Sequence, residues 1–106
     1  MPLTRDFKET IRDRVQRDPK FRKELLREGL EAMLSGEITL AKTILRDYIN
    51  ATVGFTGLAE ATNIPPKSLM RMFSPAGNPR AANVFEIVSF LQHHEGVRFH
   101  LRPTPS

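Results

Sequence analysis

The chain has 106 residues, no cysteine and a formal net charge of +4 at pH 7. This length fits one domain that buries its own core, and the lack of cysteine excludes disulfides and thiolate metal sites. No apolar run is long enough to cross a membrane, so we expect a cytoplasmic protein without a membrane partner. The excess of basic side chains favours a polyanionic partner.

The first helix is predicted from about Phe7 to Gln16. Asp6 and Glu9 have the spacing of a capping box, in which side chain and backbone groups bond reciprocally at the helix start. Apolar residues then recur at every fourth position, which is the spacing of one helical face.

Two longer helices follow in the sequence. Asp18 and Pro19 have the order of an N-cap and a first helical residue, and the pair Ser35–Gly36 ends this second helix. Its apolar stripe consists of Phe21, Leu25, Leu26, Leu30, Met33 and Leu34. A third helix is predicted from near Glu37 to Gly54. Its apolar face consists of Leu40, Ala41, Ile44, Leu45, Tyr48 and Ile49.

A sharp break separates the next two predicted helices. Thr56 is expected to cap a short fourth helix that ends at Asn63, a residue type that tolerates left-handed backbone. Pro65 and Pro66 cannot continue that helix, but proline suits the first turn of a new one. The sequence therefore predicts two short helices joined by a tight turn of fixed angle.

The last third of the chain contains a turn, a helix and a tail. The segment Ser74–Pro79, "SPAGNP", is a turn cluster, and a sixth helix follows it and ends at Gly96. In the tail, the apolar residues Val97, Phe99 and Leu101 alternate with polar residues, which predicts a β-strand with one buried face. Because a lone strand leaves its backbone groups unpaired, we expect it to pair with its twin in a second copy or with a partner's sheet edge.

The order of residue types around the break is specific. The small residue Ala59 is followed four positions later by the turn residue Asn63, then by the apolar Ile64 and, five residues on, by Leu69. A small side chain lets two helices cross closely, and the turn position favours residues that accept positive φ. This order resembles the helix-turn-helix of the phage-repressor superfamily, which includes lambda repressor and Cro and usually has glycine where this chain has Asn63.

The segment "GFTGLAEATNIPPKSLMRMFSPAGNPRAANVFEIVSFLQHHEGVRFHL" also resembles small bacterial antidote proteins of toxin–antitoxin modules. In that family a recognition helix leads to a "GNP" loop, a closing helix and a terminal strand. The chain departs from the pattern at Pro65 and Pro66, where the family commonly has a serine cap and a polar residue. We therefore expect an all-α fold of about six helices, with residues 1–36 packed on a repressor-like bundle of residues 37–106.

The resemblance implies a set of DNA contacts. The residues expected to face the bases of the major groove are Lys67, Ser68, Met70 and Arg71. The residues expected to bind backbone phosphates are Thr56, Asn78 and Arg80. No carboxylate side chain lies between Glu60 and Glu86, so the positive field is concentrated around these groups.

We predict a sequence-specific regulator of double-stranded DNA, a transcriptional repressor that binds a palindromic operator as a homodimer. The alternative is an antitoxin-type module that neutralises a partner toxin through its first two helices or its tail. On charge alone, Lys67 and Arg71 fit equally well as the solvated face of a short helix.

His93 and His94 are adjacent and cannot form a metal pair on one helical face. No catalytic constellation is present, and we expect neither an enzyme nor a bound metal or cofactor.

Overall fold

The computed structural model describes residues 5–105, with side chains from residue 10 onward. Within this part the chain forms six helices and no β-strand. The helices are α1 (Arg5–Arg17), α2 (Pro19–Leu34), α3 (Ile38–Ala51), α4 (Gly54–Thr62), α5 (Pro66–Met72) and α6 (Ala81–Glu95). None of the helices is long and apolar enough to span a membrane.

Several helix ends confirm the signals in the sequence. At the start of α2, the backbone N–H of Phe21 donates to Asp18 Oδ1 at 3.1 Å, so Asp18 is the N-cap. Asn63 ends α4 in the left-handed region with φ 58°. Gly36 and Gly96 have φ 80° and 76° and follow α2 and α6. At each of these points the residue type supplies the conformation or the acceptor that the helix end requires.

The predicted cap of α4 is wrong. The helix begins at Gly54, its N-cap position is Val53, and no side chain caps it. Thr56 instead lies exposed within the first turn. Gly54 has φ 75°, and this backbone conformation turns the chain from α3 into α4 two residues before the threonine. The capping box of Asp6 and Glu9 lies outside the described side chains.

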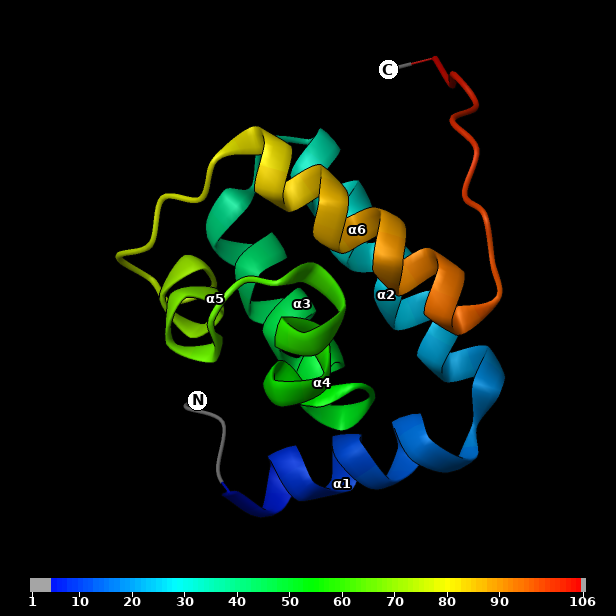
Figure 1. Cartoon of the computed structure of the whole chain (residues 1–106). Helices are drawn as coiled ribbons and strands as arrows, with labels where there is room; N and C mark the ends of the chain where they lie inside the picture. Colours follow the sequence, from blue (N-terminus) through cyan, green and yellow to red (C-terminus); the bar gives the residue numbers. More distant parts are fainter. Residues whose placement is uncertain (1–4, 106) are drawn as a thin grey trace.

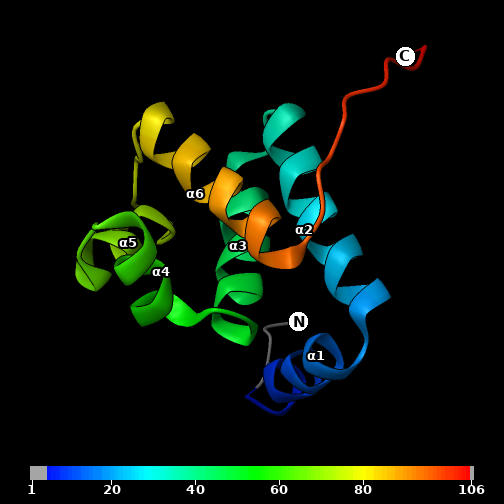
Figure 2. The same cartoon turned by 45° about the vertical axis from the view of Figure 1, so that its right-hand side comes forward.

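Helix α3 lies at the centre of the fold (Figures 1 and 2). Helices α1 and α2 pack on it from one side and α4 packs on it from another, while α5 contacts mainly α4. Gly29 allows the close approach of α2 to α3, because a Cβ there would lie 2.8 Å from Leu45 Cδ2. The largest fully buried side chains are Tyr48, Leu26, Leu45, Ile49, Leu58, Leu69, Ile87, Leu91 and Val15.

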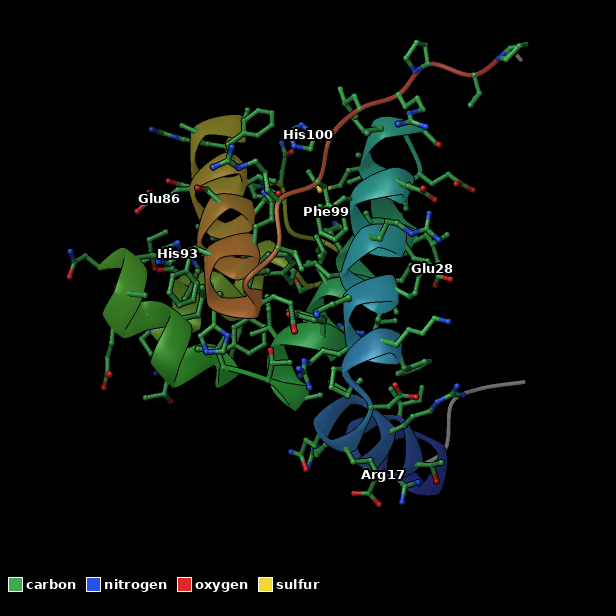
Figure 3. The ribbon with its side chains drawn as sticks, turned by 90° about the vertical axis from the view of Figure 1, so that its right-hand side faces the viewer. Arg17, Glu28, Glu86, His93, Phe99 and His100 are labelled. Atoms are coloured by element: carbon green, nitrogen blue, oxygen red, sulfur yellow. The ribbon has the colours of Figure 1, made fainter. Side chains whose placement is uncertain are left out.

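The C-terminal tail does not form the expected β-strand. Residues 97–105 have no regular secondary structure, and the tail passes between α6 and α2 (Figure 3). The N–H of Phe99 donates to Gln92 Oε1 at 2.9 Å, and Val97 and Phe99 pack against the core of their own chain. Because the described chain offers no strand edge, Val97 and Phe99 pack against helices instead, whereas Leu101 is 80% exposed.

A partly buried ion pair joins the start of α2 to the end of α6, two segments that are distant in sequence. Arg22 Nε of α2 lies 2.8 Å from Oε2 of Glu95, the last residue of α6, and the Glu95 side chain is 3% exposed. The Tyr48 hydroxyl of α3 donates to the same carboxylate, and Arg22 Nη1 donates to Val15 O of α1 at 3.0 Å. This cluster therefore links α1, α2, α3 and α6. Loss of Arg22 or of the Tyr48 hydroxyl would leave the buried carboxylate of Glu95 incompletely compensated.

The cluster predicts a loss of stability in alkali. Burial, followed by the hydrogen bond to Glu95, raises the pKa of Tyr48 well above its ordinary value of 10.0. The unfolded chain therefore releases this proton near pH 10 while the folded chain retains it. The stabilisation is complete below that pH, and the free energy of unfolding falls above it by up to about 1.4 kcal/mol per pH unit.

Tyr48→Phe lacks this ionisation, so the difference in unfolding free energy between wild type and variant should narrow above about pH 10. Urea unfolding at a series of pH values measures the difference. Tyr48 is the only tyrosine, so its tyrosinate absorbance reports the same group. A difference that stays constant with pH would contradict the prediction.

Candidate nucleic-acid interface

The turn between α4 and α5 has the geometry that the sequence predicts. The Asn63 N–H donates to Ala59 O at 2.9 Å and closes α4. Pro65 is the N-cap of α5, with φ −57° and ψ 143°, and its carbonyl accepts from Leu69 N at 3.0 Å. Pro66 is the first residue of α5. The two prolines thus stop one helix and start the next.

Apolar contacts fix α5 on the rest of the fold. Leu58 of α4 and Leu69 of α5 are fully buried, and Ile64 packs against the core from the turn. The rings of Phe55 and Phe73 lie 6.1 Å apart at 54°, which is a favourable tilted arrangement. Because these anchors lie on one side of α5, its opposite side faces outward.

The outward side of α5 carries the residues that the sequence analysis assigns to base contacts. Lys67, Met70 and Arg71 are exposed, and Ser68 is half-buried. Met72 instead packs against the core. Neither basic residue forms an ion pair within the described part of the chain. The helix therefore presents two uncompensated positive charges to solvent.

A shallow pocket connects α5 with the start of α6. Its lining includes Ser68 and Arg71 of α5 together with Asn78 and Arg80, which precede α6. No acidic residue lines this pocket, and no side chain caps the first amides of α6. Two guanidinium groups and free helix amides make this surface attractive to phosphate oxygens. Thr56 is exposed on α4 and does not line the pocket.

Two residues that the sequence analysis missed fix the loop after α5. Lys42 of α3 is 8% exposed, and its Nζ donates to Pro75 O at 3.2 Å and to Gly77 O at 2.8 Å. Gly77 lies so close to α5 that a Cβ would come 2.0 Å from Arg71 O. The role of Lys42 had one signal in the sequence. This lysine directly follows Ala41, a residue of the apolar face of the predicted third helix.

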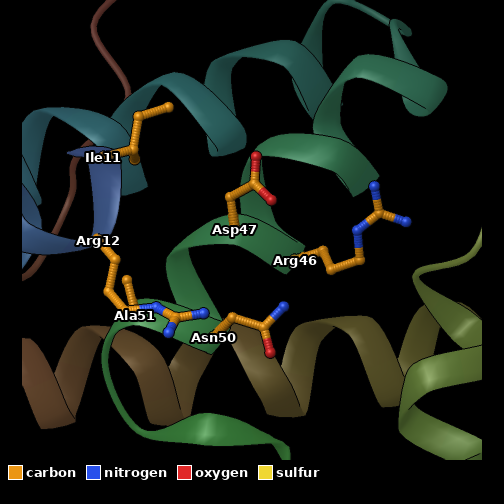
Figure 4. Close-up of a pocket in the computed structure, with 6 residues that line it drawn as sticks. All are labelled: Ile11, Arg12, Arg46, Asp47, Asn50 and Ala51. Carbon is orange, nitrogen blue, oxygen red and sulfur yellow. The ribbon is translucent and has the colours of Figure 1, made fainter. Parts of the chain in front are cut away.

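A separate small pocket lies between α1 and α3. Figure 4 shows Arg12 reaching from α1 toward Asn50 and Ala51 of α3, while Arg46 points away from α1. Asp47 also lines this pocket, whose volume of about 70 Å³ holds a few water molecules at most. The pocket is too small for an organic ligand and combines charges of both signs, so it is a poor candidate for the functional site.

No protein-family model, no curated protein and no solved structure matches this chain. The residues of the turn, of α5 and of the loop after it are therefore the basis for assigning a function. The likeness to phage repressors stays a prediction from these residues.

Lys42→Met should loosen the loop that borders the candidate interface. The substitution keeps the apolar stem but removes the donor to two carbonyls, and we expect a loss of about 1–3 kcal/mol in unfolding free energy. Hydrogen exchange at the Gly77 amide, which donates to Ser74 O at 3.0 Å, should accelerate. Lys23→Met, at an exposed position of α2, is the matched control. Equal effects of the two substitutions would contradict this role of Lys42.

Proposed function

We propose that the chain is a sequence-specific DNA-binding regulator that acts as a homodimer on a palindromic operator and represses transcription, with its own promoter as the first candidate target. The observation that carries the proposal is the exposed, uncompensated basic side of α5, held outward by the turn from Asn63 to Pro66. A helix presented in this way fits the major groove of B-DNA.

Each exposed side chain of α5 suits a different feature of the groove. The fork of Arg71 matches the two acceptors of guanine, whereas Lys67 serves guanine or a phosphate as a movable point charge. Met70 can contact a thymine methyl group, and the Ser68 hydroxyl can donate or accept. Arg71 is therefore the residue that we assign the largest share of base discrimination.

The surroundings of α5 supply the contacts that position it. Asn78 and Arg80 line one pocket beside the uncapped start of α6, and these groups would together bind one stretch of backbone phosphates. Thr56 in the first turn of α4 would contact phosphates on the other side of the groove. In a dimer, two such surfaces would read half-sites about 34 Å apart, one turn of the duplex.

The antitoxin alternative has less support from the structure than from the sequence. The apolar stripe of α2 that suggested a toxin-binding surface is largely used within the chain: Leu26 is fully buried, and Leu25 and Met33 pack against the core. The tail likewise packs on its own chain through Val97 and Phe99. DNA binding is therefore the function that the geometry favours.

Arg71→Ala tests base reading. With a duplex selected from a random pool, we expect a loss of about 10- to 100-fold in affinity, because one good bidentate contact contributes about 1–3 kcal/mol of discrimination. Affinity for a scrambled duplex should fall less. Arg17→Ala, which removes an exposed charge of α1, is the control. Equal losses on both duplexes would refute base reading by Arg71.

The salt dependence of binding tests the phosphate contacts. With three basic contacts per chain, log K plotted against log salt should have a slope of roughly −5 for a dimer. Arg80→Ala should reduce the magnitude of this slope by about 2 per dimer while the sequence preference is retained. An unchanged salt slope in the variant would show that Arg80 does not contact a DNA phosphate.

A further inference from the structure

An apolar pocket lies at the end of the molecule where α2 ends and where α3 and α6 begin. Its walls include Met33 of α2, Leu45 of α3 and Val84 of α6, together with Phe73. The pocket has a volume of about 220 Å³. A cavity of about 150 Å³ already accommodates benzene, so this pocket has room for an aromatic ring. Lys42 and Asn78 also line the pocket, and Asn78 is the one residue of its lining that the proposed DNA contacts use.

Exposed apolar side chains accompany this pocket. Phe85 directly follows Val84 and is 68% exposed, and Leu34 directly follows Met33 and is 67% exposed. Ile38 lines the pocket itself and is 51% exposed. These three side chains expose roughly 300–400 Å² of apolar surface, comparable with the largest patches on monomeric proteins, which are often functional.

We propose that a second copy of this chain covers this face, with Phe85 of each copy inserted into the apolar pocket of the other. Phe85 is the residue next to Val84 of the pocket wall, so an exposed ring and a pocket with room for a ring belong to the same end of α6, and exchanging them between two copies would give the self-complementary contact of a two-fold interface. The exposed apolar area is close to half of the roughly 800 Å² that each partner buries in a standard interface, and polar rim residues would supply the remainder.

The dimensions of the molecule agree with a dimer through this face. The described chain measures 38 × 30 × 29 Å, so the centres of two copies in contact lie on the order of 30–40 Å apart, and the separation of their α5 helices depends on the distance of α5 from the two-fold axis. This range includes the one-turn spacing of two operator half-sites. Phe73 both ends α5 and lines the pocket, so the interface would lie mechanically close to the proposed reading helix.

The tail is a weaker candidate for the same role. Pairing it across a dimer as a β-strand would break the bond from Phe99 N to Gln92 Oε1 and would withdraw Val97 and Phe99 from their own core. Leu101 is 80% exposed and stays available, but one side chain buries too little area for a stable interface.

Sedimentation equilibrium of the full chain without DNA tests the proposal. We expect a dimer for the wild type in the micromolar range, and a rise in the dissociation constant of at least about 30-fold for Phe85→Ser, as for an aromatic hot spot. Leu101→Ser is the matched control and should leave the dimer intact. Because Phe85 is exposed, its truncation should not alter the helical circular dichroism.

Ile38→Asp places a charge in the pocket wall and is a second variant, which should also dissociate the dimer. A monomeric wild type, or a Phe85→Ser variant that dimerises as tightly as the wild type, would overturn the proposal. Dissociation by Leu101→Ser alone would assign the interface to the tail. The measurement contains no DNA, so a dimer that binds no operator would refute the proposed function and leave this inference intact.

Discussion

The arrangement of the candidate site depends on one backbone constraint, the corner between α4 and α5. Asn63 adopts φ 58°, a backbone conformation that few residues other than glycine tolerate. Pro65 and Pro66 then fix the backbone φ angles at the start of α5. A helix of seven residues has too little hydrogen bonding to hold its own direction. The direction of α5 therefore comes from the corner and from the buried contacts of Leu69 and Phe73.

The far end of α5 is held by a different kind of contact. Lys42 donates to two loop carbonyls, and Gly77 lies against the last turn of α5, where any side chain would clash. Burying a lysine is costly unless its ammonium group is hydrogen-bonded, and here two carbonyl acceptors meet that requirement. The rigidity of the proposed interface thus comes from a proline corner at one end of α5 and a charged tether at the other.

The sequence predicted the elements better than it predicted the contacts between them. Local signals fixed the helix ends at Asp18, Asn63 and Gly96, because the residue at a helix end acts on its nearest neighbours. The wrong cap at Thr56 had a local cause, the positive φ of Gly54 two residues earlier, but the missed contacts had distant causes. Lys42 reaches a loop more than thirty residues away, and Glu95 meets Arg22 at a separation of 73 residues, which no local pattern encodes. The tail has the alternation of a strand, but periodicity alone does not say whether a strand edge or a helical groove covers its apolar side.

The shortness of α5 also limits what one chain can read. Seven residues span about 10 Å, so only two turns can face the groove, and few side chains reach base edges. Each good base contact contributes about 1–3 kcal/mol of discrimination, so under the proposed function one chain would distinguish its site from other DNA only weakly. Two copies at a fixed separation add their contacts without any further lengthening of the helix. The proposed function thus calls for a second copy, and the interface proposed around Phe85 would supply it without involving α5.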